Sequence, residues 1–319
     1  MNSDRQRLRQ DFLDCCDLHA ARLEPLVQDA SFRRYFRIHD QNQTYILMDA
    51  PPTKEKIEPF INIAKHLSGL NLKAPVIHHF DINHGFILLE DFGDNTFTRL
   101  LAANHDENDL YNLAVDTLIN LHKNPHANST VIPEYSSTLL ISEALLLPDW
   151  YCPYRTGNPI SKKTRDSYIQ CWESIIASLP VVEKTLVLRD YHVDNLIKLD
   201  DGQCGLLDFQ DAVIGCGAYD LVSLLEDARR DISADLQKRL LKHYFAEFEH
   251  LNHDDFMRWY AVLGAQRHCK VLGIFTRLSV RDKKHHYLDH LSRVDALLRS
   301  HLHCKDLQPL KYWLMQNNL

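Results

Sequence analysis

Three polar residues near the middle of the chain constrain the fold most. The segment Leu188–Leu196 holds Asp190 and Asn195 with four residues between them, and Asp208 follows at the end of another apolar run. Between Asn195 and Asp208, the sequence Asp200-Asp201-Gly202 predicts a tight turn. We therefore expect a hairpin that brings the side chains of Asp190, Asn195 and Asp208 into one cluster.

These residue types suit phosphoryl transfer. Such a site needs a carboxylate that orients and deprotonates the attacking hydroxyl, and oxygen ligands that hold magnesium on the phosphates. The spacing predicts Asp190 as the base and Asn195 and Asp208 as the metal ligands. The alternative is that Asp190, Asp194 and Asn195 only cap a turn. Asp208, however, ends an apolar run, and a partly buried carboxylate is costly without a cation or a donor.

The 319-residue chain begins with alternating β-type patterns and continues with helical ones. Predicted elements of the first part are a helix over about 4–25, hairpin strands over 32–39 and 44–49, a helix over 58–70 and a strand over 85–89. The polar segment Glu90–Asp94 then predicts a hinge. From about residue 96 the pattern is helical, interrupted by a loop over 124–137 and by apolar runs at 186–188 and 206–207 that flank the turn.

This organisation predicts an α+β fold with two lobes. We expect a small, β-rich N-terminal nucleotide-binding lobe over residues 1–92 and a larger, mostly helical catalytic and substrate-binding lobe over 93–319.

Charge and targeting signals exclude several classes of protein. A net charge of -7 without a dense basic run argues against nucleic acid and anionic membranes as partners. The eight cysteines lack C-x-x-C pairs and zinc spacing, so we expect reduced thiols. The charged N-terminus and the absence of a run of roughly 20 apolar residues predict a cytoplasmic protein, and we expect a monomer.

The central residues resemble a known superfamily. Arg189-Asp190 with Asn195, followed by Asp208-Phe209, is similar to the catalytic and metal loops of the protein-kinase-like superfamily. His192 occupies the position where the aminoglycoside and choline kinase branch has His and protein kinases usually have Lys. Asp220 lies in a segment similar to the one that braces the catalytic loop in that branch. The resemblance implies a bilobal fold, ATP, Mg²⁺, a small-molecule acceptor and a role for His192 in the catalytic loop.

Flanking motifs narrow the resemblance. The segments Asp29–Arg37, Met48–Pro52 and Gly264–Phe275 look like those of the anomeric sugar kinases of bacterial peptidoglycan recycling, over roughly residues 25 to 295. That resemblance implies an amino-sugar acceptor, N-acetylmuramate or N-acetylglucosamine, phosphorylated at its anomeric hydroxyl.

The chain departs from the superfamily where the phosphates should be held. The first hairpin carries no glycine, and Met48 falls near the expected position of the phosphate-binding Lys. Our hypothesis is that Ser31 and the neighbouring backbone cover the phosphates while an arginine supplies the missing charge. The candidates are Arg33, Arg34 and Arg37, of which the first and last share one face of the strand. The alternative for each arginine is a solvated position on the strand.

The remaining contacts are predicted from residue chemistry and from the resemblance. Backbone groups of Glu90 and Phe92 are expected to bind adenine at the hinge. Acceptor contacts are predicted at Glu143, Trp150 and Tyr151, with core packing as the alternative for the two aromatic residues. Arg267, in an otherwise apolar helix, is expected either to pair with an acidic neighbour or to receive an anionic group such as a lactyl carboxylate.

Two other functions compete with an amino-sugar kinase. One keeps the enzyme and changes the acceptor to an aminoglycoside, a choline-like amine or another small molecule. The other is a pseudokinase scaffold, which the absence of the Lys favours. The combination of Asp190, Asn195 and Asp208 argues against a scaffold, because binding a partner does not require three polar groups at one metal site.

Overall fold

The structure is a computed structural model that describes residues 2–26, 32–41, 43–129 and 132–319. Internal contacts separate the chain into two compact units. Unit 1 comprises Met1–Ala114 and Val193–Asp211, and unit 2 comprises Val115–His192 and Ala212–Leu319. The chain therefore passes from one unit to the other three times. The assignment of nucleotide binding to residues 1–92 and of catalysis and substrate binding to residues 93–319 stays a prediction.

Unit 1 is built on a five-stranded antiparallel sheet with the order β1-β2-β3-β5-β4. Its strands are β1 (Arg22–Pro25), β2 (Arg34–Asp40), β3 (Gln43–Asp49), β4 (Ile77–Asp81) and β5 (Phe86–Glu90). The predicted hairpin is confirmed as β2 and β3, in which Arg37 lies opposite Ile46. The predicted strand over 85–89 is confirmed as β5, and Met48 is buried in β3 opposite Ile87.

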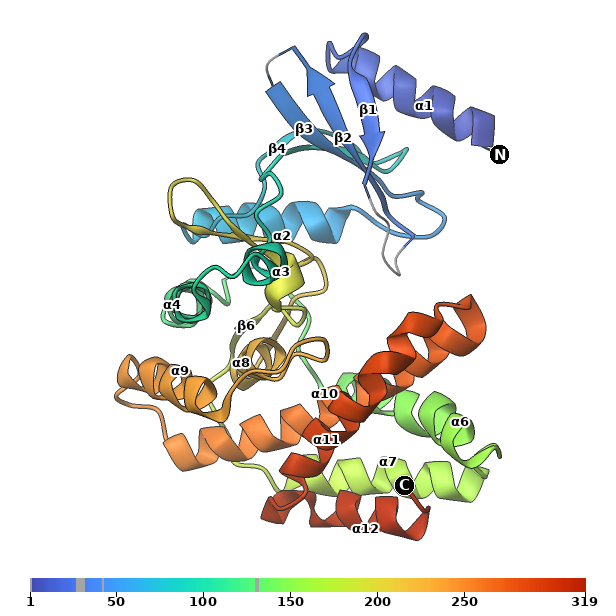
Figure 1. Ribbon diagram of the computed structural model, residues 1–319, viewed down its shortest axis with the longest axis vertical. Coiled ribbons are helices and arrows are strands. Elements are labelled where there is room, and N and C mark those ends of the chain that lie inside the picture. The colour runs from blue at the N-terminus through green and yellow to red at the C-terminus, as the bar shows by residue number, and fades with distance from the viewer. Residues whose placement is uncertain (1, 27–31, 42, 130–131) are drawn as a thin grey trace. The chain divides into compact units, whose positions relative to one another are not determined.

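The helix predicted over 4–25 is wrong in its second half. Helix α1 (Asn2–Cys15) ends early, and residues from Arg22 onward form β1 on the sheet edge instead. Pro25 cannot donate to a helix interior, and Asp17 adopts a left-handed φ of 60° that ends the helical path. Figure 1 shows α1 lying against the sheet, where Phe12 stacks on Phe86 with ring centroids 5.4 Å apart.

The rest of unit 1 includes a second hairpin. Strand β7 (Leu196–Lys198) pairs with β8 (Cys204–Leu206) around the predicted turn, where Gly202 has a φ of 81°. The helices are α2 (Glu58–Gly69), which confirms the prediction over 58–70, and α3 (Phe97–Ala102). We predicted that the apolar run at 186–188 forms one arm of this hairpin, and this prediction is wrong. The run contributes to β6 (Thr185–Val187), which pairs with β9 (Val213–Gly215) in unit 2.

Unit 2 is mostly helical. Its helices and turns are the end of α4 (Glu107–His122), α5 (Ser137–Ala144), a π-helical turn (Leu147–Tyr151), α6 (Cys152–Thr156), α7 (Lys162–Ala177), α8 (Ala218–Leu225), α9 (Ala234–Ala246), α10 (His253–Asp282), α11 (Leu291–His301) and α12 (Gln308–Gln316). The gap between α4 and α5 confirms the predicted loop in its described part. Helix α10 has 30 residues and packs against α5, α8 and α11 (Figure 1).

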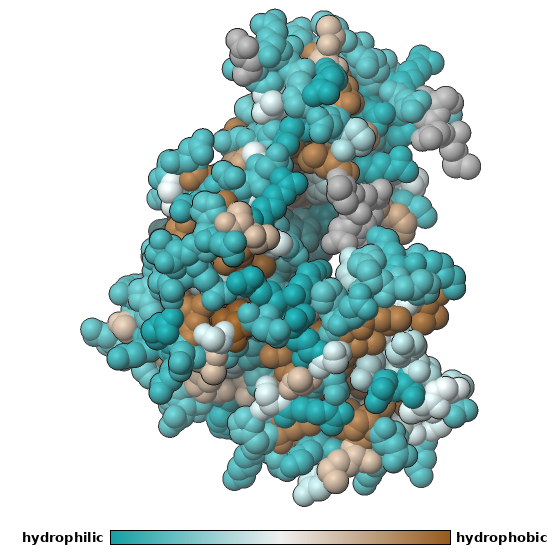
Figure 2. All heavy atoms as spheres, viewed as in Figure 1, coloured by the Kyte–Doolittle hydropathy of each residue, from teal (hydrophilic) through white to brown (hydrophobic). Residues whose placement is uncertain are grey.

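Each unit has its own hydrophobic core. The core of unit 1 lies between α1 and the sheet, and that of unit 2 surrounds α10. Hydrophilic residues cover most of the face seen in Figure 2. Five of the eight cysteines are buried, and none of the eight forms a disulfide in the described part of the chain. None of the described helices combines the length and the apolar character needed to cross a bilayer.

Candidate active site

The loop that follows β6 holds Asp190 in a strained and tightly braced backbone. Arg189 has a φ of 70°, a region that non-glycine residues rarely adopt. The buried carboxylate of Asp220 accepts hydrogen bonds from the backbone amides of Leu188 (2.7 Å) and Arg189 (2.8 Å). Arg267 donates to the carbonyl of Arg189 (3.0 Å). The bracing role predicted for Asp220 is confirmed, and Arg267 contributes to the same support.

The electrostatic surroundings of Asp190 favour its carboxylate form. Burial acts to raise the pKa of Asp190, but nearby positive groups outweigh it and lower the pKa to about 2. Lys270 has the largest favourable effect, followed by Arg267, whose Nη1 lies 3.7 Å from the carboxylate. His192 is buried, which lowers its pKa, while Asp227 opposes that shift. The carboxylate form of Asp190 is therefore favoured at neutral pH.

Glu143 forms the centre of a buried network in unit 2. Its carboxylate accepts from Arg189, from Lys270 (2.9 Å), from the hydroxyl of Tyr135 and from Gln266 (3.3 Å). Burial acts to raise the pKa of Glu143, and the two cations, with Lys270 first, bring it below its usual range. Since protein groups already occupy both carboxylate oxygens, these contacts favour a tethering role for Glu143 over direct binding of an acceptor.

Unit 1 carries the two predicted metal ligands close together. The backbone carbonyl of Asn195 accepts from the amide of Leu207 (2.9 Å), which places Asn195 beside the start of the Asp208 segment. Asp208 has a left-handed φ of 56°, and its side chain is 40% exposed. Next to it, Phe209 is buried against Phe60, with ring centroids 4.9 Å apart. Asp208 is thus held with its carboxylate partly open to solvent, as predicted.

Arg33 links the carboxylate of Asp208 to a second acidic residue. Its Nη2 lies 3.2 Å from Asp208 Oδ1, and its Nε lies 2.9 Å from Glu55 Oε2. The side chain of Arg33 is only 11% exposed; burial works to lower its pKa, but Tyr35, Asp208 and Glu55 raise it overall. Glu55 was missed in the sequence because it stands in a polar stretch between Pro52 and α2 without periodicity.

The other phosphate candidates differ from Arg33. Arg37 forms ion pairs with Asp91 (2.7 Å) and Asp94 (2.9 Å), which tie β2 to the hinge. Arg34 is exposed on the other face. Ser31 lies outside the described residues. Among these candidates, Arg33 is the one that the fold brings to a predicted metal ligand.

The hinge follows β5 in unit 1. The amide of Glu90 donates to the carbonyl of Val76 (2.9 Å), so only other backbone groups of this segment remain for a ligand. The ring of Phe92 lies over Gly205, where an added Cβ would come within 2.8 Å of it. A polar hollow of about 850 Å³ borders the hinge and includes Glu90 and Phe92 in its lining.

The predicted acceptor residues separate into two groups. Tyr151 is buried in the core of unit 2, which favours the core-packing alternative, and Trp150 is half-buried in the same π-helical turn. Arg267 and Glu143 lie in the network around Asp190. Lys270, one helical turn after Arg267, belongs to that network but was not predicted. A second cation at this spacing in an otherwise apolar helix was the signal that could have revealed it.

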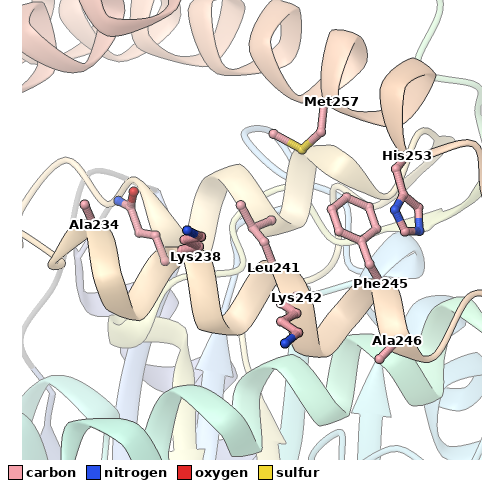
Figure 3. A pocket seen from close by; sticks show the side chains of 9 residues that line it. Ala234, Lys238, Leu241, Lys242, Phe245, Ala246, His253 and Met257 are labelled. Atoms are coloured by element: carbon pink, nitrogen blue, oxygen red, sulfur yellow. The ribbon is translucent and has the colours of Figure 1, made fainter.

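A different hollow lies on the surface of unit 2. Figure 3 shows Leu241, Phe245 and Met257 lining it, with Lys238 and Lys242 from α9. It includes none of the predicted site residues.

Residues 22–260 match the family model described as "Phosphotransferase enzyme family", and the chain belongs to that family.

The curated relatives are more specific. The chain is 33% identical to the N-acetylmuramate/N-acetylglucosamine kinase of Neisseria meningitidis serogroup B over 299 residues, covering 90% of this chain and 88% of the relative. It is 35% identical to the protein of the same name from Pseudomonas aeruginosa over 280 residues, covering 86% and 81%.

Among solved structures, the fold resembles that of choline kinase LicA from Streptococcus pneumoniae. The TM-score is 0.66 and the sequence identity is 14%, over 92% of this chain and 99% of the other. This likeness confirms the predicted α+β kinase-like fold.

Proposed function

We propose that this protein is a kinase that transfers the γ-phosphoryl group of ATP to the anomeric hydroxyl of N-acetylmuramate or N-acetylglucosamine. The observation that carries the acceptor assignment is the identity of 33% and 35%, over 90% and 86% of the chain, to two relatives that both bear the name of such a kinase. The predicted cytoplasmic location, the monomeric state and the exclusion of nucleic acid stay predictions.

Asp190 is the proposed base. With its pKa lowered to about 2, the carboxylate is ready to accept a hydrogen bond from the acceptor hydroxyl, orient it and receive its proton as the new bond to phosphorus forms. An anomeric hydroxyl is more acidic than an ordinary alcohol, so a weakly basic carboxylate suits it. We assign His192, two residues further in the same loop, to support of that loop.

The residues of unit 1 suit a magnesium ion and the nucleotide. Asn195 and Asp208 offer an amide and a carboxylate oxygen, the hard donors that Mg²⁺ prefers, and they would hold it against the phosphates. Bound there, the ion would neutralise charge on the transferred group. Arg33, paired with Glu55, takes the place of the lysine–glutamate pair of other kinases. Ser31 and Arg34 stay proposed phosphate contacts.

The nucleotide assignment is also supported by proteins of the same fold. LicA has been solved in complex with AMP, and an aminoglycoside phosphotransferase has been solved in a ternary complex with streptomycin and ATP. We place adenine at the hinge, where the carbonyl of Glu90 and the amide of Phe92 are the groups proposed to bind its edge, because the amide of Glu90 is already paired.

The test is an acceptor panel with magnesium and ATP. N-acetylmuramate, N-acetylglucosamine, choline and an aminoglycoside are each incubated with the protein, and phosphorylated product is measured. We expect product from the amino sugars and a loss of about 10²–10⁴-fold in kcat for Asp190→Asn. Asp194→Asn, the same change four residues away, is the matched control and should retain activity.

The panel separates the competing functions. Product from choline or the aminoglycoside alone would move the acceptor to that class. No product from any acceptor, with a folded protein, would favour a scaffold. Full activity of Asp190→Asn would remove the proposed base.

A further inference from the structure

Cationic side chains gather around Asp190 in unit 2. Arg189, Arg267 and Lys270 surround the carboxylates of Glu143 and Asp190. The third carboxylate nearby, Asp220, has its pKa raised to about 7 by burial, although the amides of Leu188 and Arg189 oppose the shift.

A further pair acts on the same loop. Asp227 and Arg229 contribute one charge of each sign, and both act on His192. Buried cations are unfavourable unless acidic side chains or an anionic ligand balance them.

The three cations are not used in the same way. The guanidinium of Arg189 is bonded to Glu143, and Arg267 is bonded to the carbonyl of Arg189, to the hydroxyl of Tyr219 (3.3 Å) and to Asp190. Both therefore shape the loop. Among the described residues, Lys270 contacts one carboxylate oxygen, Glu143 Oε1 (2.9 Å), although an ammonium group has three N–H donors.

A purely structural role does not account for Lys270. Glu143 accepts from Arg189, Tyr135 and Gln266 as well as from Lys270, so Lys270 is not its only partner. Lys270 nevertheless has the largest electrostatic effect of all cations on Asp190, the residue at which the acceptor hydroxyl is proposed to bind. Lys270 stands one turn of α10 after Arg267, whose Nη1 lies 3.7 Å from Asp190, so its ammonium group belongs to the network around the proposed acceptor site.

We propose that the ammonium group of Lys270 binds a carboxylate on the acceptor, and so sets the preference for N-acetylmuramate over N-acetylglucosamine. The two sugars differ in the lactyl carboxylate that only the first one carries. This inference rests on the proposed function, because the acceptors are those of the proposed kinase. Arg267 is then a positioning residue for Asp190, and Glu143 holds the Lys270 side chain in place.

The experiment measures kcat/KM for both sugars with wild type, Lys270→Met and Lys270→Arg. Loss of one charge-assisted hydrogen bond predicts that Lys270→Met lowers the N-acetylmuramate to N-acetylglucosamine ratio of kcat/KM on the order of 10- to 100-fold. Lys270→Arg keeps the charge and should restore most of the ratio. Lys242→Met, an exposed charge removal on α9, should leave the ratio unchanged.

The ratio is independent of folding yield, because both sugars are measured with the same preparation and an inactive fraction cancels. A ratio within about twofold of wild type in Lys270→Met would overturn the proposal. A uniform loss on both sugars would also overturn it, since it would indicate a structural role alone.

Calorimetric titration with N-acetylmuramate separates this proposal from the proposed function. If wild type phosphorylates neither sugar, the proposed function fails. Binding of N-acetylmuramate that is lost in Lys270→Met and kept in Lys242→Met would still support the carboxylate site. Binding that is absent in wild type or unchanged in Lys270→Met would overturn it.

Discussion

Among single residues, Arg33 is the proposed source of the positive charge that a lysine near the position of Met48 would be expected to supply. Its guanidinium reaches two acidic residues at once, Glu55 at 2.9 Å and Asp208 at 3.2 Å. A planar guanidinium can make such divided contacts, whereas an ammonium group acts as a single point of charge. One arginine can therefore hold the metal-ligand segment and present charge to a phosphate.

Replacing Arg33 tests this role. We expect Arg33→Met to raise the KM for ATP by about tenfold or more, the equivalent of roughly 1.4 kcal/mol, with a smaller effect on the KM for the acceptor. Arg22→Met, the same change at an exposed residue of β1, is the matched control. Initial-rate kinetics with ATP varied would measure both. Equal effects of the two variants would argue against Arg33 as the phosphate contact.

Asp220 is the second residue whose role can be isolated. Its two oxygens accept from the amides of Leu188 and Arg189, and an asparagine has only one oxygen to offer. We expect Asp220→Asn to lower the free energy of unfolding by about 1–3 kcal/mol and to lower kcat, because the left-handed Arg189 loses support. Thermal denaturation and kcat would be measured beside Asp231→Asn, which changes an exposed aspartate. An unaltered kcat would show that catalysis does not depend on the hydrogen bonds of Asp220 to the loop.

At the scale of elements, periodicity predicted the parts of the fold that bury one face. The strands β2, β3 and β5 and the helix α2 follow from alternation and from helical spacing. Strand β1 and the pairing of β6 with β9 did not. Strand β1 is mostly exposed on the sheet edge, and β6 finds its partner 26 or more residues away, so neither leaves a local pattern.

Helix α10 depends on a glycine at a close contact. A Cβ on Gly273 would lie 2.2 Å from the backbone oxygen of Leu146, which cannot move as a side chain can. We expect Gly273→Ala to lower the free energy of unfolding by roughly 1–3 kcal/mol or more. Gly69→Ala in α2, where no atom lies within 4 Å of the added Cβ, should cost nothing and could add up to about 1 kcal/mol. Chemical denaturation would measure both, and equal values would contradict the contact.

Three buried side chains also connect the helices of unit 2. Glu226 Oε2, just after α8, lies 2.7 Å from Nε2 of His268 in α10 and from Nε2 of His301 in α11. Among the described residues, this is the group of carboxylate and imidazole side chains close enough to share one cation. The distances are those of hydrogen bonds, and these bonds account for how the triad stabilises the packing of α8, α10 and α11.

At the scale of the whole molecule, stability should depend on pH through His122. Its Nδ1 shares a hydrogen bond with the hydroxyl of Tyr244 (2.9 Å), and burial lowers the pKa of His122 to about 3. Between that value and the unfolded value of about 6.5, the unfolded chain binds more protons than the folded one. The contribution of a neutral His122 to stability is therefore present above about pH 6.5 and is lost as the pH falls.

Wild type is compared with a His122 variant, because both proteins contain Asp220. The raised pKa of Asp220 changes the free energy of unfolding with pH in the opposite direction to His122. From pH 7.5 to 5.5, wild type should lose about 1.4 kcal/mol more free energy of unfolding than His122→Gln. His250→Gln, an exposed change, should behave as wild type. Urea denaturation at the two pH values would measure the difference, and parallel losses in all three proteins would contradict it.

The candidate site could be predicted from the sequence where one segment carries it. Asp190, Asn195 and Asp208 stand in short motifs, so their spacing and the intervening turn were enough to propose them as site residues. Glu55 and Lys270 act through partners 22 and 127 residues away, Arg33 and Glu143. The sequence does not show such pairings; for Lys270 the one signal was its position three residues after Arg267 in an otherwise apolar helix, and Glu55 stands in a polar stretch without periodicity.

The interleaving of the two units also limits how such a gene can change by recombination. Asp190 lies in unit 2 and Asn195 in unit 1, on opposite sides of the passage between His192 and Val193. No single crossover can exchange one complete unit for that of a distant relative. A chimera joined near that passage would inherit the proposed base from one parent and the proposed metal ligands from the other. Viable hybrids should therefore arise mainly from parents whose loops have diverged little.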